Sequence, residues 1–129
     1  MSRENCQDQQ SSNPPEKQNE ITELNNGGLK YDGDKPSLAL IPSEALLEIA
    51  KVLDFGAGKY TADNWRRGFK YRRVISAAMR HILAWNSGED VDAETGLSHL
   101  AHAACCLSFL ITFEKTGTGV DDRFTYEKN

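Results

Sequence analysis

The spacing of apolar residues divides the middle of the chain into three predicted helices. The first is expected over residues 42–55 and is predicted to end at the glycines of 56–58. The second is expected over residues 71–86 and the third over 97–115, with polar loops between them. No alternating strand pattern of any length is visible. The pattern therefore predicts an all-α fold built as a small bundle of three main helices.

The predicted helices differ in how much of their surface is apolar. The stripe predicted to be buried consists of Leu46, Ile49, Ala50 and Leu53 in the first helix and of Val74, Ala77, Ala78, His81, Ile82 and Trp85 in the second. The third helix is apolar nearly all round, so it needs partners on more sides than the other two helices provide. We therefore expect a homodimer or homotetramer that completes a four-helix-type bundle.

The composition changes at both ends of the chain. Residues 1–28 are rich in Gln, Asn, Ser, Glu and Pro, and we predict that they are disordered because they contain too few apolar side chains to offset the entropy of ordering. Residues 29–115 are predicted to form the folded domain. Residues 116–129 have two glycines and no clear periodicity, which predicts an extended or frayed tail.

Charge and composition exclude some classes of protein. The formal net charge of −4 argues against a protein that mainly coats nucleic acid. Three cysteines, two of them adjacent, are not typical of a secreted disulfide framework. No apolar run reaches the roughly 18 residues of a membrane span, and the N-terminus lacks the apolar segment of a signal peptide. We therefore expect a cytoplasmic protein without a membrane partner.

Two groups of carboxylates are candidates for a metal site. Glu44 and Glu48 are four residues apart, so they share one face of the first predicted helix, and carboxylate oxygens suit Mg²⁺. A solvated face that includes Lys51 is the alternative interpretation. The loop of residues 89–94 holds four more acids, but it does not match an EF-hand because Thr95 stands where the loop needs glycine. An acidic surface turn is the alternative for this loop.

All three histidines lie on faces predicted to point inward. His99 and His102 are three residues apart on the third helix, and His81 belongs to the buried stripe of the second. They are either hydrogen-bonded core residues, metal ligands, or groups that orient carboxylates and a catalytic water. The zinc spacings HExxH and paired CxxC are absent, and no histidine is followed by aspartate, which argues against a His-Asp phosphohydrolase.

Basic and aromatic residues alternate between the first and second predicted helices. The cations of this region are Lys59, Arg66, Arg67, Lys70, Arg72, Arg73 and Arg80. Tyr60, Trp65, Phe69 and Tyr71 stand among them. Cations hold phosphates while an aromatic ring stacks on a base, although a solvated basic face explains the same pattern. Together, the acids and cations favour metal-assisted hydrolysis of a nucleotide.

Three segments carry a resemblance to a known family. They read KYDGDKPSLALIPSEALLEIAKVLDFGAGKY, NWRRG and RHILAWNSGEDVDAETGLSHLAHA. Over residues 29–112 the chain resembles the phage dATP/dGTP diphosphohydrolase N-terminal domain family, which includes MazZ-type enzymes and is regarded as related to the MazG-like all-α nucleoside triphosphate pyrophosphohydrolases. The resemblance implies that Mg²⁺ or Mn²⁺ assists cleavage of a purine deoxynucleoside triphosphate to its monophosphate and pyrophosphate.

The sequence departs from the MazG-like pattern at two places. Glu44 and Glu48 match the first and last acids of its helical EExxE motif, but the middle acid is Ala45. The following ExxD motif has no counterpart on the third helix, where His99 and His102 occupy that spacing, and Cys106 stands where the resemblance leads us to expect a polar residue. Either the acidic loop takes over metal binding, or the site differs from that of the MazG-like enzymes.

These observations define an expected site. The predicted metal ligands are Glu44, Glu48, Glu89 and Asp92, with Glu48 and His102 as the residues that orient or deprotonate the attacking water and with His81 and His99 behind them. The predicted substrate contacts are Lys35, Lys59, Arg66 and Arg67 for the phosphates and Trp65 for the base. The alternatives are a catalytically silent nucleotide-binding protein or a nucleic-acid-binding phage accessory protein that uses the segment WRRGFKYRR, and the net acidity argues mildly against the latter.

Overall fold

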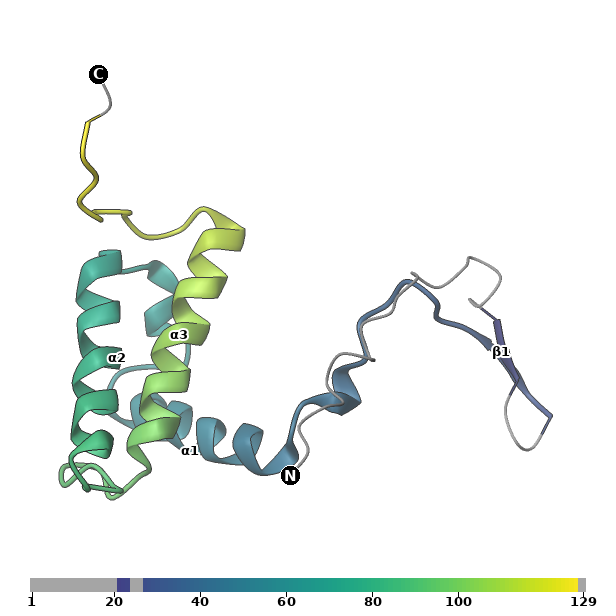
Figure 1. Ribbon diagram of the computed structural model, residues 1–129, viewed down its shortest axis with the longest axis horizontal. Coiled ribbons are helices and arrows are strands. Elements are labelled where there is room, and N and C mark those ends of the chain that lie inside the picture. Colours follow the sequence, from purple (N-terminus) through teal and green to yellow (C-terminus); the bar gives the residue numbers. More distant parts are fainter. Residues whose placement is uncertain (1–20, 24–26, 128–129) are drawn as a thin grey trace, which may run out of the picture. The chain divides into compact units, whose positions relative to one another are not determined.

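The computed structural model describes residues 21–23 and 27–127 of the chain (Figure 1). These residues fall into two compact units, which divide between Leu40 and Ile41. The first unit contains strand β1 (Ile21–Glu23), strand β2 (Leu29–Tyr31) and the 3-10 helix η3 (Leu38–Leu40). The second contains the helices α1 (Ser43–Lys59), α2 (Tyr71–Asn86) and α3 (His99–Thr116), together with the 3-10 helix η4 (Asn64–Arg67). The predicted all-α class is confirmed.

The first unit is small. Strands β1 and β2 pair antiparallel, with Ile21 opposite Tyr31 and Glu23 opposite Leu29. We predicted no strand, and three-residue strands are too short to show alternation in a sequence. Residues 1–20 and 24–26 of the segment predicted to be disordered lie outside the described residues.

In the second unit, α2 and α3 run side by side in opposite directions, and α1 lies across one end of the pair (Figure 1). The bounds of α2 agree with the predicted 71–86. Helix α3 begins after Ser98, whose side chain accepts a hydrogen bond from the backbone N–H of Ala101 at 3.1 Å, as a helix N-cap does. It ends at Thr116 and is followed by the capping residue Gly117, which has a φ of +73°.

The predicted end of the first helix is wrong. Helix α1 continues through the glycines of 56–58 to Lys59, and its last turn is closed by the hydrogen bond from the Tyr60 N–H to the Gly56 carbonyl at 2.8 Å. Neither Gly56 nor Gly58 adopts a positive φ, so neither one ends the helix in the way that a left-handed glycine does. This extra turn carries Lys59 and Gly56 into the wall of the cavity described below.

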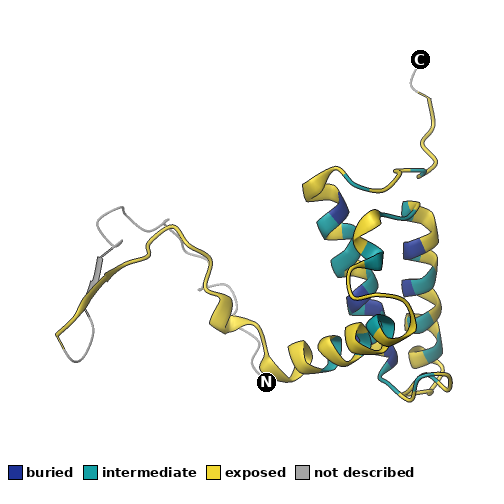
Figure 2. Cartoon of the chain, turned by 180° about the vertical axis from the view of Figure 1, so that it is seen from behind, coloured by how far each residue is buried: buried dark blue, intermediate teal, exposed yellow. Residues whose placement is uncertain are grey.

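The core lies mainly between α2 and α3 (Figure 2). Its buried residues are Val74, Ala78, His99, Ala101, Ala103, Cys105 and Phe113. The predicted burial of the α1 stripe is wrong for a single chain, because Leu46, Ala50 and Leu53 are exposed and Ile49 is half-buried. In the second predicted stripe, Ile82 and Trp85 are exposed as well. Helix α1 contacts only α3 closely, which leaves most of its apolar face uncovered.

The C-terminal tail packs against the start of α2 rather than fraying. The N–H of Tyr71 donates to the carbonyl of Val120 at 2.9 Å, and the N–H of Val120 donates to the carbonyl of Phe69 at 3.2 Å. Asp122 then accepts a hydrogen bond from the N–H of Arg72 at 2.8 Å, which satisfies one of the free donors at the N-terminus of α2. The tail is therefore extended, as predicted, but it is also held in place.

Candidate functional site

A cavity of about 480 Å³ opens among α1, α2, α3 and the loops that connect them. This volume lies in the range of pockets that hold small molecules. Among its lining residues are Gly56, Lys59, Trp65, His81, Asp92 and His102. The cavity therefore brings together five residues of the predicted site and a glycine that leaves room beside them.

The three histidines form one cluster at the wall of this cavity. The rings of His81 and His102 stack with their centroids 4.5 Å apart and their planes 8° apart. Nδ1 of His81 lies 2.9 Å from Nδ1 of His99, and Nε2 of His99 lies 2.7 Å from a carboxylate oxygen of Glu89. A hydrogen-bonded row thus runs from the half-exposed Glu89 through the buried His99 to a histidine that lines the cavity.

A second row holds His102. Its Nε2 lies 2.8 Å from the hydroxyl oxygen of Thr95, and that hydroxyl donates to Asp92 at 3.1 Å. Because the hydroxyl proton goes to Asp92, the Thr95 oxygen accepts from the N–H groups of His102 and Leu97. The sequence identifies Thr95 only as the residue that breaks the EF-hand pattern, and no sequence signal indicates that it links an acid to a histidine.

The cluster shifts the pKa values of its members. Burial lowers the pKa of His81, and His102 and His99 lower it further against the effect of Asp92. Burial also lowers the pKa of His102, although Asp92 acts in the opposite direction. Burial alone would raise the pKa of Asp92, but hydrogen bonds from Thr95 and from the backbone, together with the nearby histidines, outweigh it and lower that pKa. Neutral imidazoles and an ionised Asp92 are therefore favoured at neutral pH.

Aromatic residues form another part of the cavity wall. Trp65 lines the cavity and stacks on Phe109, with ring centroids 4.2 Å apart and planes 12° apart. The guanidinium carbon of Arg66 lies 4.6 Å from the centroid of the Trp65 ring, and Nε of Arg66 donates to Asp63 at 2.8 Å. Protein groups therefore already contact the Trp65 ring, whereas Tyr60 lines the cavity with 61% of its surface exposed.

The predicted cations are only partly brought to the cavity. Lys59 lines it, and its ammonium lies 3.6 Å from a carboxylate oxygen of Glu94. Arg66 is held beside Trp65, and Arg67 is exposed on η4 without lining the cavity. Lys35 belongs to the other compact unit. Arg80, which was predicted only as part of the basic region, lines the cavity from α2.

Both adjacent cysteines also line the cavity. Burial raises the pKa of the Cys105 thiol to about 12, and the neighbouring Cys106 raises it as well. Burial also raises the pKa of Cys106, although Arg80 acts in the opposite direction. The two thiols are therefore protonated at neutral pH and act as apolar lining rather than as nucleophiles.

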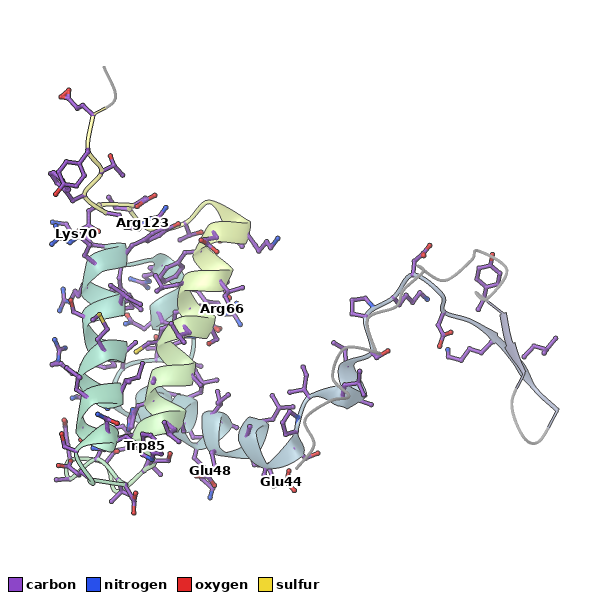
Figure 3. All side chains as sticks on the ribbon, viewed as in Figure 1. Glu44, Glu48, Arg66, Lys70, Trp85 and Arg123 are labelled. Carbon is purple, nitrogen blue, oxygen red and sulfur yellow. The ribbon has the colours of Figure 1, made fainter. Side chains whose placement is uncertain are left out.

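The structure does not bring the four predicted metal ligands together within one chain. Glu89 contacts His99, and Asp92 contacts Thr95. Glu44 and Glu48 lie in the first two turns of α1 (Figure 3), where Glu48 pairs with Lys51 at 2.8 Å. Within residues 21–23 and 27–127, no three His, Cys, Asp or Glu side chains are grouped so that they could hold a metal ion.

Two of these carboxylates nevertheless suit a hard cation. Glu44, Glu48 and the cavity-lining Val52 are four residues apart, so they follow one face of α1. The carboxylates therefore continue the cavity-lining face towards the N-terminus of the helix. Mg²⁺ is usually bound by one or two carboxylates, with waters and substrate phosphates completing its shell. The donor chemistry of this pair fits such an ion.

A bundle whose cavity is lined by apolar and aromatic residues with a few histidines, acids and cations is the kind of site that takes a small molecule. Residues 25–123 match the model of the family described as dATP/dGTP diphosphohydrolase, N-terminal, and the chain belongs to this family. The predicted family is thereby confirmed.

A curated relative matches the same part of the chain. A dATP/dGTP diphosphohydrolase of Salmonella phage PMBT28 is 41% identical over 96 residues, which are 74% of this chain and 33% of that protein. The match thus spans about a third of the relative's length. No solved structure matches the chain. None of the described helices has the length and apolar character that crossing a membrane requires.

Proposed function

We propose that this protein hydrolyses a purine deoxynucleoside triphosphate to its monophosphate and pyrophosphate, with Mg²⁺ or Mn²⁺ as cofactor, in the cytoplasm of a phage-infected cell. The observation that carries this proposal is the cavity itself. It is lined by two neutral histidines, two acids and two cations, in a chain whose family and phage relative are named for dATP/dGTP hydrolysis.

The residues divide between the phosphates and the base. Lys59 and Arg80 lie at the cavity and supply positive charge for phosphate oxygens. Trp65 and Tyr60 supply apolar area for a base, with Trp65 held rigidly by Phe109. A long anionic substrate that sits in the cavity along α1 extends towards Glu48 and Glu44. Arg66, Arg67 and Lys35 stay predicted phosphate contacts.

The cofactor is proposed from the donor chemistry of α1. Glu44 and Glu48 would hold a divalent ion, which when bound neutralises phosphate charge and makes bound water more acidic. Water is oriented or deprotonated by the cavity-lining imidazoles, because a neutral ring nitrogen accepts a proton at neutral pH. Hydrogen bonds fix the orientation of both rings, that of His102 through Thr95 and that of His81 through His99.

We also propose that a second copy of the chain completes the bundle. Both α1 and α3 carry exposed apolar side chains, among them Leu47 at 63% and Ile111 at 57% exposure. A patch of this kind is unusual on a monomer, whereas helix-on-helix association buries it. The exposed faces thus support the predicted homodimer or homotetramer.

The activity is tested by product analysis. The protein is incubated with each deoxynucleoside triphosphate and Mg²⁺, and the products are separated by chromatography. The proposal expects monophosphate and pyrophosphate, with purine substrates preferred. Diphosphate and inorganic phosphate would place the cleavage at another bond, and no turnover would support a silent nucleotide-binding protein instead.

A further inference from the structure

In the row of Glu89, His99 and His81, the ionised carboxylate determines which nitrogen donates each hydrogen bond. Glu89 is 55% exposed at its side chain, and an ionised carboxylate only accepts hydrogen bonds. Nε2 of His99, at 2.7 Å, must therefore carry the proton and donate it. The side chain of His99 is 5% exposed, and its Nε2 contacts Glu89.

The direction continues to the cavity. When His99 is neutral and protonated at Nε2, its Nδ1 has a lone pair, so Nδ1 of His81 donates to it across 2.9 Å. Neutral His81 then carries its proton on Nδ1 and a lone pair on Nε2. His81 lines the cavity, and its Nε2 makes no hydrogen bond to any residue in the described part of the chain. The row thus leaves an unprotonated nitrogen available to a ligand.

We infer that His81 is the proton acceptor of this site, and that His99 and Glu89 are positioning residues that fix its tautomer. This inference rests on the proposed function. An oriented imidazole whose second nitrogen is held by a further group is the arrangement of an activated general base. The row assigns the base to a residue that we had predicted only as a supporting one.

The proton step balances within the row. The O–H bond of a water in the cavity breaks as an N–H bond forms at Nε2 of His81. The oxygen of that water bonds to the α-phosphorus while the bond from this phosphorus to the α–β bridging oxygen breaks, and pyrophosphate leaves with that oxygen. The positive charge is shared when the Nδ1 proton of His81 moves to Nδ1 of His99. Glu89 then faces an imidazolium at 2.7 Å and stabilises it.

His102 has a different part in this scheme. Its Nε2–H donates to Thr95, which is itself committed to Asp92. Its ring stacks on His81 and restricts the rotation that would break the row. Arg80 and Asp92 are the other charged groups near His81, and burial keeps His81 neutral at neutral pH.

The tautomers are measured directly by long-range ¹H–¹⁵N NMR of the full protein with ¹⁵N-labelled histidine, at a pH near 7.5. We expect the Nδ1–H form for His81 and the Nε2–H form for His99. Glu89→Gln should keep both tautomers, because the glutamine amide oxygen accepts the same hydrogen bond from His99. Glu89→Leu removes that acceptor, so the two tautomers should no longer be fixed. An Nε2–H tautomer of His81 in the wild-type protein overturns the inference.

Turnover separates a catalytic role from a structural one. His81→Gln is expected to lower kcat for the triphosphate by about 100-fold, the lower end of general-base contributions. Glu89→Gln is expected to lower it by about 10-fold with the tautomers intact, because the imidazolium loses its counter-charge. Asp90→Asn removes one charge from the same exposed loop and is the matched control, with wild-type turnover expected.

Two outcomes contradict different claims. Equal turnover of Glu89→Gln and Asp90→Asn overturns the relay while the proposed function stands. Failure of the wild-type protein to hydrolyse any deoxynucleoside triphosphate overturns the function, and with it the role of His81 as a base.

Discussion

Gly119 tests whether the tail supports the aromatic wall of the cavity. Its φ is +83°, and a Cβ built on it would lie 2.8 Å from the carbonyl oxygen of Phe69 and 3.4 Å from the rings of Phe113 and Tyr71. Those rings pack on one another, and Phe113 also contacts Trp65 at a centroid distance of 6.1 Å. Gly119→Ala therefore strains the backbone and pushes the tail away from α2.

The magnitude has two parts. A left-handed backbone costs an L-residue about 1–2 kcal/mol. The contact with Phe69 disturbs the two hydrogen bonds that join Val120 to Phe69 and Tyr71, each worth about 0.5–1.5 kcal/mol. We expect Gly119→Ala to lower the free energy of unfolding by about 2–5 kcal/mol. The matched control is Gly117→Ala, because Gly117 has a φ of +73° with nothing within 4 Å of its Cβ position. It should lose only the backbone part, about 1–2 kcal/mol.

Thermal unfolding followed by circular dichroism measures this pair. Each kcal/mol corresponds to roughly 4–8 °C in Tm for a domain of this size. Gly119→Ala should therefore melt clearly below Gly117→Ala, which should itself melt a few degrees below wild type. Equal Tm values for the two variants would refute the argument, since they would show that the tail does not press on Phe69.

Three further predictions concern the histidines, the cation and the assembly. The folded-state pKa values of His81 and His102 are lowered, so their contribution to stability is complete above the unfolded pKa of about 6.5 and is lost as pH falls below it. The free energy of unfolding in urea should therefore fall with pH in this range, and combining His81→Gln with His102→Gln should flatten that dependence. Millimolar Mg²⁺ should raise Tm, and Glu48→Gln with Glu44→Gln should abolish the rise, while an equal rise in that variant would remove these carboxylates from the proposed site. Leu47→Glu places a charge on the exposed face of α1 and should shift the mass by light scattering towards the monomer without loss of helicity, and an unchanged mass would place the interface elsewhere.

The sequence predicted the three main helices correctly but not every residue at which a helix begins or ends. The bounds of α2 were predictable because apolar spacing and flanking loops agree at both ends. The end of α1 was not, because glycine ends a helix only when its φ turns positive, which no sequence pattern at 56–58 reveals. The strands β1 and β2 are too short for periodicity to indicate.

The site was partly predictable for a similar reason. Helical spacing placed His81, His99 and His102 on inward faces, and the structure puts them in one cluster. Spacing says nothing about distances between helices, so the four-carboxylate set was assembled from residues that lie apart. The loop of residues 89–95 shows this best, because its acids contact histidines instead of facing Glu44 and Glu48.

The central claim is that the cavity holds the reacting substrate, and two glycines of α1 allow a direct test. Gly56 lines the cavity and Gly58 does not, while a Cβ at either position would have nothing within 4 Å. Leucine is favoured over glycine in a helix by roughly 1 kcal/mol, so both Gly56→Leu and Gly58→Leu should fold at least as stably as wild type.

The measurement is kcat/KM for dATP hydrolysis in the presence of Mg²⁺. We predict that Gly58→Leu keeps the wild-type value and that Gly56→Leu, which fills part of the cavity, lowers it by at least about 10-fold, or 1.4 kcal/mol of transition-state stabilisation. Wild-type kcat/KM in Gly56→Leu would contradict the account, because the substrate would then be bound outside this cavity.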